Sequence, residues 1–188
     1  KIKCVPTIHP AAILREWSSR AVVLNDLRRV KLHMVSRSYD NRPTWNFIIR
    51  PTIDVVISAL RLLIVKCYKE ETWIDFDIET RGRGHVYIDC IGLSWSRTDA
   101  LCIPFMTYSN KEGYWLEEEE TQIVWLLYKL LTHSNVRVRW HNGLFDAQIV
   151  HHNWHFIPRG AQDTMISQHS LFAALQKALY FVASMYCN

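Results

Sequence analysis

The chain has 188 residues and a formal net charge of +4, with 49% apolar and 21% charged residues. This composition excludes an intrinsically disordered chain and is sufficient for one well-buried domain with an appendage. The longest apolar run, from Val55 to Cys67, is interrupted by Arg61 and is too short to cross a bilayer.

The five cysteines are odd in number and include no Cys-x-x-Cys pair. Neither a zinc site nor a disulfide framework is therefore indicated, and a reducing cytosol is the default expectation. The chain opens on Lys1 rather than Met and shows no signal peptide, so one interpretation is a fragment of a longer protein.

Residues 1–33 begin with a strand-like piece, Lys3 to Ile8, then a His9-Pro10 turn and a helix-period apolar run. The segments VPTIHPAAILR and VLNDLRRVKLH resemble the C-terminal end of the uracil-DNA glycosylase superfamily. That resemblance implies that His9 belongs to a wall facing a flipped base. The earlier glycosylase motif, which holds the water-activating residue, is absent. We therefore interpret residues 1–33 as a glycosylase remnant. His9 is interpreted as a relic or a turn residue in preference to a catalytic residue.

Residues 34–51 are rich in Ser, Arg, Asn, Asp and Pro, which predicts a linker that includes a short strand from Trp45 to Ile49. Thr52 to Tyr68 then carries apolar residues at helical spacing, with Thr52 as the cap. We place the start of the main domain, residues 52–188, at this helix.

The next stretch, Trp73 to Thr80, predicts a buried strand that carries acids on one side. Side chains alternate across a strand. One face therefore holds Ile74, Phe76 and Ile78, and the other holds Trp73, Asp75, Asp77 and Glu79. Three carboxylates on one face repel one another unless a cation neutralises them, and Mg²⁺ or Mn²⁺ suits oxygen ligands. A solvated strand edge is the more frequent reason for acids at this spacing.

Two further strands are predicted, Val86 to Ser96 and Ala100 to Phe105, with a hairpin loop between them. Three sequential strands followed by a helix fit an antiparallel meander that opens a mixed sheet. Arg81 and Arg83 in the preceding turn could meet a phosphate backbone, although turn arginines are usually only solvated.

Four acids, Glu117 to Glu120, precede or begin a helix expected from Glu118 to Leu131, where negative charge stabilises the helix dipole. A strand from Val136 to Trp140 follows. Its end delivers His141, Asn142 and Gly143 to the rim where Glu79 emerges, and Asp146 begins the next helix. Asp163-Thr164 is interpreted as the N-cap of a later helix.

The motifs FDIET, HNGLFD and DTMISQH together resemble the proofreading domain of family A DNA polymerases, especially the phage-encoded ones. These belong to the four-carboxylate 3′–5′ exonucleases. The resemblance extends from about Thr72 to the C-terminus. It implies an α/β ribonuclease H-like exonuclease fold, with a mixed sheet opened by an antiparallel three-strand meander and helices on both faces. Residues 1–33 would add a strand-helix appendage.

By this resemblance Asp77 would bridge two Mg²⁺ or Mn²⁺ ions, Glu79 would bind one and orient the water, and Asp146 would hold the other. Two such ions about 4 Å apart suit phosphodiester hydrolysis, because they activate the water and neutralise charge on the leaving oxygen. These three acids are the candidate catalytic residues.

The same resemblance implies a substrate and partners. Thr80 and Asn142 would hydrogen-bond the terminal nucleotide, and Phe145 would pack beneath the site. The substrate would be a single-stranded DNA 3′ end, and a polymerase domain or subunit would be the partner, with no membrane involved. The location would be the cytoplasm, that of the bacterial host if the chain is phage-encoded.

The family's third motif supplies a fourth Asp, but Thr164 to Asn188 contains no Asp or Glu. Tyr180 stands where related phage polymerases often have Asp. Two hypotheses follow: an exonuclease whose polymerase domains are missing or encoded separately, and a weak or inactive module that binds single-stranded DNA or a polymerase partner. A third, built on residues 1–33, is a uracil-recognising repair fragment.

Overall fold

The computed structural model describes residues 4–34, 43–81, 84, 87–107 and 113–187. Contacts divide the chain into two compact units. One unit is Thr44–Thr164 and contains the sheet, and the other joins Lys1–Pro43 to Met165–Asn188.

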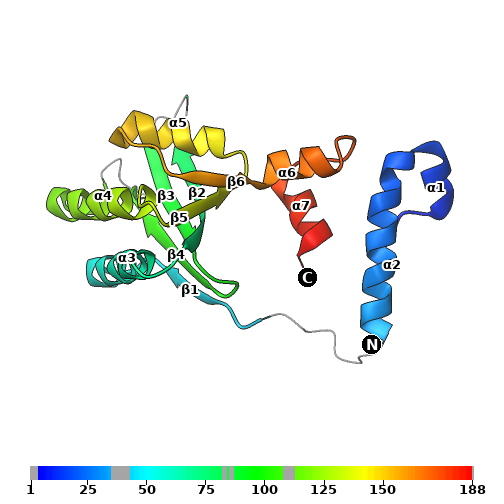
Figure 1. Ribbon diagram of the computed structural model, residues 1–188, viewed down its shortest axis with the longest axis horizontal. Coiled ribbons are helices and arrows are strands. Elements are labelled where there is room, and N and C mark those ends of the chain that lie inside the picture. Colours follow the sequence, from blue (N-terminus) through cyan, green and yellow to red (C-terminus); the bar gives the residue numbers. More distant parts are fainter. Residues whose placement is uncertain (1–3, 35–42, 82–83, 85–86, 108–112, 188) are drawn as a thin grey trace. The chain divides into compact units, whose positions relative to one another are not determined.

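Six strands form one mixed sheet in the order β1-β4-β3-β2-β5-β6 (Figure 1). The strands are β1 (Asn46–Ile49), β2 (Thr72–Arg81), β3 (Tyr87–Ser94), β4 (Asp99–Pro104), β5 (Val136–Trp140) and β6 (Gly160–Asp163). Strands β2, β3 and β4 pair antiparallel, whereas β1 joins β4, β5 joins β2 and β6 joins β5 in parallel. The expected mixed sheet and three-strand meander are confirmed.

Strand β1 lies inside residues 34–51, the segment expected to be a linker. It pairs with β4 from Asn46 opposite Asp99 to Ile49 opposite Cys102. The Asn46 amide also donates a hydrogen bond of 3.1 Å to the Asp99 carboxylate. These bonds make β1 an edge strand of the sheet.

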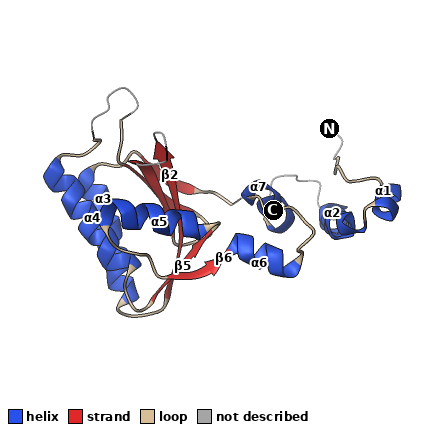
Figure 2. Ribbon diagram, turned by 90° about the horizontal axis from the view of Figure 1, so that it is seen from above, coloured by secondary structure: helices blue, strands red, loops and turns tan. Residues whose placement is uncertain are grey.

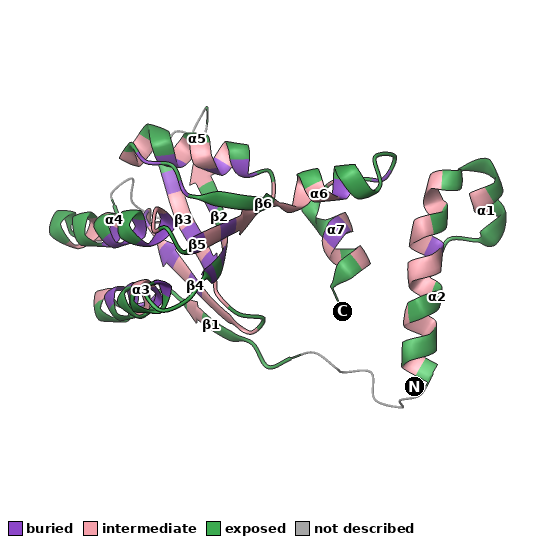
Figure 3. Ribbon diagram, in the orientation of Figure 1, coloured by how far each residue is buried: buried purple, intermediate pink, exposed green. Residues whose placement is uncertain are grey.

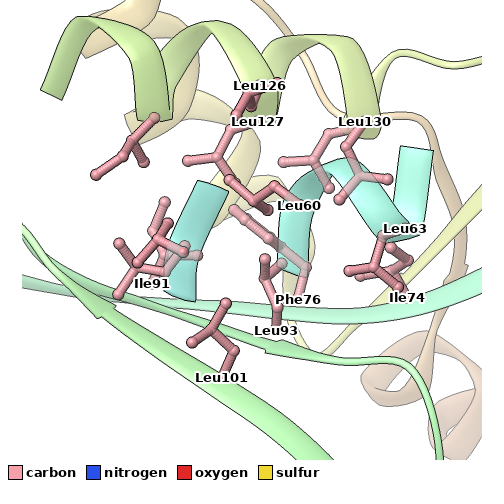
Figure 4. Packing of buried hydrophobic residues seen from close by; sticks show 14 of the residues in the cluster. Leu60, Leu63, Ile74, Phe76, Ile91, Leu93, Leu101, Leu126, Leu127 and Leu130 are labelled. Atoms are coloured by element: carbon pink, nitrogen blue, oxygen red, sulfur yellow. The ribbon is translucent and has the colours of Figure 1, made fainter. Parts of the chain in front are cut away.

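Three helices lie on the same side of the sheet (Figure 2). They are α3 (Ile53–Cys67), α4 (Glu117–Leu131) and α5 (Gly143–Trp154). Their buried residues recur at helical spacing and pack on the inward face of the sheet. Figure 4 shows this core, in which Leu60, Leu63, Leu126, Leu127 and Leu130 of the helices meet Ile74, Phe76, Ile91, Leu93 and Leu101 of the strands. Each such side chain contributes roughly 1.5–3 kcal/mol on burial.

The two faces of β2 differ as the alternation predicts. Its inward side chains, Ile74, Phe76 and Ile78, are each at most 5% exposed (Figure 3). On the opposite face Asp77 and Glu79 are exposed. A slip of one residue would bury the acids and expose the apolar row, so the core determines on which face the acids lie.

The second unit is helical in its described residues. It contains α1 (Pro10–Arg15), the short 3-10 helix η1 (Trp17–Ser19), α2 (Arg20–Met34), most of α6 (Thr164–Leu171) and α7 (Leu179–Tyr186). The predicted strand from Lys3 to Ile8 is wrong for residues 4–8, which join no neighbouring strand. The helical run is interrupted at Glu16, whose φ of −135° and ψ of 88° are not helical. The appendage is therefore helical rather than strand-helix.

Helix α2 contacts the C-terminal end of α7 within this unit. The Asn25 amide donates to the Met185 carbonyl at 2.9 Å. The Arg29 guanidinium donates to the carbonyls of Ser184 at 3.0 Å and Cys187 at 3.3 Å. Helix α2, near the start of the sequence, is thus hydrogen-bonded to the end of α7, near its C-terminus. None of the helices in the described ranges is long and apolar enough to span a membrane.

Candidate active site

Asp146 lies in the first turn of α5, and its carboxylate reaches the acidic strand. The residue is only 3% exposed. Its Oδ1 accepts a hydrogen bond of 3.1 Å from the backbone N–H of Ile78. Ile78 stands between Asp77 and Glu79 in β2, so a residue 68 positions later in the sequence contacts the acidic strand at its centre.

The charges of Asp77 and Asp146 act on each other. Burial raises the pKa of Asp146 to about 6, and the negative charge of Asp77 adds to this rise. Surrounding protein atoms partly desolvate the Asp77 carboxylate and raise its pKa, although Asp77 is an exposed residue. The nearby His141 acts in the opposite direction and lowers the pKa of Asp77. The two acids therefore share a partly desolvated environment, where a cation is attracted more strongly than in bulk water.

Glu79 and Thr80 lie further along β2, at an irregularity of the strand. Glu79 shares the exposed face with Asp77 and stands opposite Cys90 of β3. The register shifts between Glu79 and Thr80, as in a β-bulge, so that Thr80 pairs with Ile88. Within the residues that the structure describes, no three or more Asp, Glu, His or Cys side chains converge as a ready-made metal site. Asp77 and Asp146 come together, whereas Glu79 does not complete a three-ligand cluster with them.

The turn between β5 and α5 carries Asn142 and Phe145. Asn142 has a left-handed backbone, with φ 63° and ψ 40°. Its N–H donates to Asp163 Oδ1 at 3.2 Å, and the Gly143 N–H donates to Asp163 Oδ2 at 2.9 Å. Phe145 is partly buried and packs against the core. The nucleotide contacts of Thr80, Asn142 and Phe145 stay predictions.

His141 directly follows the last residue of β5. In the parallel pairing of β2 with β5, Asp75 stands opposite Arg139, and extending this register by two residues places His141 beside Asp77. The His141 Nδ1 lies 2.9 Å from the Thr164 hydroxyl, which donates to the Trp140 carbonyl at 3.1 Å. The imidazole is therefore held beside Asp77, whose pKa it lowers.

The three weaker candidates from the sequence, Arg81, Arg83 and His9, are not placed at this acidic site by the described structure. Arg81 donates to the Thr107 carbonyl at 2.8 Å and forms an ion pair of 2.7 Å with Asp89, so its guanidinium is bound within the protein. Arg83 lies outside the described residues. His9 caps α1, because its Nδ1 accepts a hydrogen bond of 3.2 Å from the Ala11 N–H.

The contacts of Asp163 with α5 are not predicted by the sequence pattern. An Asp-Thr pair before a helix predicts an N-cap of that helix, here α6. The Asp163 carboxylate accepts hydrogen bonds from the N-terminus of α5, which this pattern does not indicate. The cause is the parallel pairing of β5 with β6, which sets Asp163 opposite Trp140. Since no local pattern encodes this pairing, the contact could not be found from the sequence.

Neither a protein-family model nor a curated protein matches this chain. Among solved structures, the catalytic core of RRP6 from Trypanosoma brucei matches with a TM-score of 0.56 and 15% identity, over 77% of this chain and 35% of that one. RNase D from Escherichia coli, an exoribonuclease involved in structured RNA processing, matches with a TM-score of 0.52 and 16% identity, over 77% of this chain and 34% of its own. The chain thus spans about a third of the length of these two structures. Its likeness to them shows that the chain has the ribonuclease H-like exonuclease fold.

Proposed function

We propose that the chain is a two-metal-dependent 3′–5′ exonuclease that removes nucleotides from DNA 3′ ends. The hydrogen bond from the Ile78 N–H to Asp146 carries this proposal, because it brings the acid of α5 beside Asp77 of β2. Binding divalent cations at a scissile phosphate requires such acids from separate segments. The fold shared with the exoribonuclease RNase D supports a nuclease.

The residues at this site fit a hard divalent cation. Their donors are carboxylate oxygens, which suit Mg²⁺ or Mn²⁺. The negative charge of Asp77 contributes to the raised pKa of the buried Asp146, so a bound cation would relieve the repulsion between these two acids. Glu79, exposed on the same strand face, would supply a third carboxylate.

The three acids have separate roles in the proposed hydrolysis. Asp77 would hold both ions from β2, Asp146 would hold one of them from α5, and Glu79 would hold the other. Glu79 would also orient the attacking water in line with the scissile bond. When bound, the two ions supply the activated water and the positive charge that stabilises the leaving 3′ oxygen.

Thr80, Asn142 and Phe145 would bind the terminal nucleotide of a single-stranded 3′ end. The resemblance of FDIET and HNGLFD to phage proofreading domains supports DNA as the substrate. It also supports a polymerase domain or subunit as the partner and the host cytoplasm as the location. Because RNase D has the same fold and is an exoribonuclease, RNA is the competing substrate in the test.

A second candidate function is a weakly active or inactive exonuclease-like module that binds single-stranded DNA or a polymerase partner. One observation favours it: the described residues contain no three-ligand cluster. Losing one ligand from a two-ion site would lower the rate by several orders of magnitude, since positioning and charge stabilisation supply most of the acceleration.

The first prediction tests activity with Asp77→Ala. The wild-type chain with Mn²⁺ should shorten a 5′-labelled single strand stepwise from its 3′ end, and DNA and RNA strands should be compared. Asp77→Ala should lower this rate by ~10³-fold or more, because it removes the carboxylate that would hold both ions at the reacting phosphate.

Asp54→Ala, on the exposed side of α3, is the matched control and should retain the wild-type rate. Equal digestion by Asp77→Ala would show that another nuclease is responsible and would refute the exonuclease proposal. Tight binding of the strand by the wild type without any shortening would instead support the non-catalytic module.

A further inference from the structure

The last residue of β6, Asp163, and the first residue of α6, Thr164, hold the turn that carries the candidate site. The Asp163 carboxylate uses both oxygens, accepting the N–H of Asn142 at 3.2 Å and the N–H of Gly143 at 2.9 Å. These are backbone groups at the start of α5, where N–H donors have no partner inside the helix. One carboxylate therefore fixes the point from which α5 leaves the sheet.

Thr164, the next residue, holds the other half of the turn. A hydroxyl has one proton, and a carbonyl can only accept, so the Thr164 proton goes to the Trp140 carbonyl. The 2.9 Å contact of the same hydroxyl with His141 then requires a proton on the imidazole Nδ1. In the neutral ring this leaves Nε2 as an acceptor.

We propose that Asp163 and Thr164 are positioning residues of the candidate site. Asp163 sets the backbone of Asn142 and Gly143, and hence the angle at which α5 presents Asp146 to β2. Thr164 sets the orientation and the tautomer of His141 beside Asp77. The proposal rests on the proposed nuclease function, but the hydrogen bonds themselves can be tested without it.

Neither residue needs to contact the substrate to matter. Catalysis at a phosphodiester depends on positioning, and a displacement of about 1 Å lowers a rate by ~10²-fold. Asp163→Asn retains the shape of the side chain but replaces one accepting oxygen by an NH₂ group, which cannot accept an N–H. Thr164→Val removes the hydroxyl at similar volume, and Thr164→Ser retains it.

Hydrogen exchange and NMR of the full chain provide the test. In Asp163→Asn the amides of Asn142 and Gly143 should exchange at least ~10-fold faster than in the wild type, since one N–H loses its acceptor and the other keeps only a neutral one. In Thr164→Val the ¹⁵N shifts of His141 should leave the Nδ1–H pattern, and Thr164→Ser should restore it. Thr132→Val is the matched control, because Thr132 also donates to a backbone carbonyl, that of Tyr128, away from this turn.

Activity provides the second readout. Asp163→Asn and Thr164→Val should lower kcat by ~10²-fold with a smaller change in KM, whereas Thr132→Val should leave both unchanged. Wild-type exchange at Asn142 and Gly143 in a folded Asp163→Asn chain would overturn the role of Asp163. An unchanged His141 tautomer in Thr164→Val would overturn the role of Thr164. This test does not depend on whether the Asp163→Asn variant folds. If the wild type cuts no nucleic acid, the proposed function fails, while exchange and NMR still decide these two roles.

Discussion

Asp146 is an acidic side chain that is 3% exposed, and the hydrogen bond to its carboxylate comes from a neutral backbone N–H of β2. Burying a charged carboxylate is unfavourable unless a cation or strong donors compensate. The free-energy cost of burying the Asp146 carboxylate is increased further by the nearby negative charge of Asp77. Such a residue reduces the stability of the metal-free chain and becomes useful when a cation is present.

The second prediction concerns the pH dependence of stability. The pKa of Asp146 rises from 3.8 to about 6 on folding, mainly through burial. The folded chain then binds a proton more tightly than the unfolded chain between these values, so stability should fall as pH rises from about 4 to about 6. Asp146→Asn should remove this decrease and stabilise the metal-free chain at pH 7 by on the order of 1–3 kcal/mol.

Urea unfolding in EDTA across this pH range measures the effect. The Asn side chain retains an oxygen that can accept the Ile78 N–H, so the variant should fold. Parallel stability curves for the wild type and Asp146→Asn would contradict the raised pKa.

At the scale of elements, the β5–α5 turn is the most constrained part of the site. The Trp140 ring lies against Gly143 and Gly160, and a Cβ added at either glycine would come within 2.0 Å of a ring carbon. No side chain larger than hydrogen fits between the indole and these backbones. The ring thereby sets how closely α5 and β6 approach the end of β5.

The third prediction follows from this contact. Gly143→Ala should destabilise the chain by about 1–3 kcal/mol, because the indole or α5 must move to make room. Asp146 lies in the first turn of the same helix, so the affinity for Mn²⁺ should also decrease. Gly92→Ala is the control, since its Cβ would lie 3.8 Å from the nearest atom, the Asp77 carbonyl oxygen. Equal stability of the two variants by urea unfolding would refute the argument.

The Arg139–Asp75 pair joins β2 to β5 below the site. The guanidinium donates to both carboxylate oxygens, and it also lies 5.8 Å from the Trp73 ring centre. The side chains are 41% and 42% exposed, so the pair contributes less than about 1 kcal/mol. The pair spans the register position where Asp75 faces Arg139, but at this energy it adds little to a register that core packing sets.

For the whole molecule, cation binding should couple to the stability of the sheet unit. The fourth prediction is that Mn²⁺ at about 100 times its Kd stabilises the chain by roughly 2.7 kcal/mol, if it binds only the folded state. This corresponds to a rise in Tm of roughly 5–10 °C for a chain of this size. Asp77→Ala should lose the shift, and Asp54→Ala should keep it. No shift at millimolar Mn²⁺ with an intact fold would count against the site.

The two ends of the chain are also coupled, because Arg29 of α2 binds the carbonyls of Ser184 in α7 and of Cys187, the residue that follows α7. A cation at the C-terminal carbonyls of a helix is favourable for the helix dipole. The fifth prediction is that Arg29→Ala raises the hydrogen-exchange rate of α7 amides by ~10-fold, while sheet amides keep theirs. Arg28→Ala, which removes the same charge from an exposed neighbouring position, should leave α7 unchanged. Equal effects of the two variants would refute the contact.

Much of the fold could be predicted because its patterns are local. The alternation of Ile74, Phe76 and Ile78 with acids predicts both the strand and its buried face, and the helical spacing from Val56 to Leu63 predicts α3. The predicted strand from Lys3 to Ile8 is wrong for residues 4–8, because a strand needs a partner ladder and none is formed there. Strand propensity alone does not supply that partner.

By itself the sequence determined which residues carry acid, which carry the core and in what order, because side-chain alternation and helical spacing operate over a few residues. Only the tertiary structure decided that Asp146 is buried against Ile78, that Asp163 binds the start of α5 and that His141 lies beside Asp77. These contacts depend on the pairing of strands far apart in the sequence, and that pairing is set by the packing of the whole core rather than by any one segment.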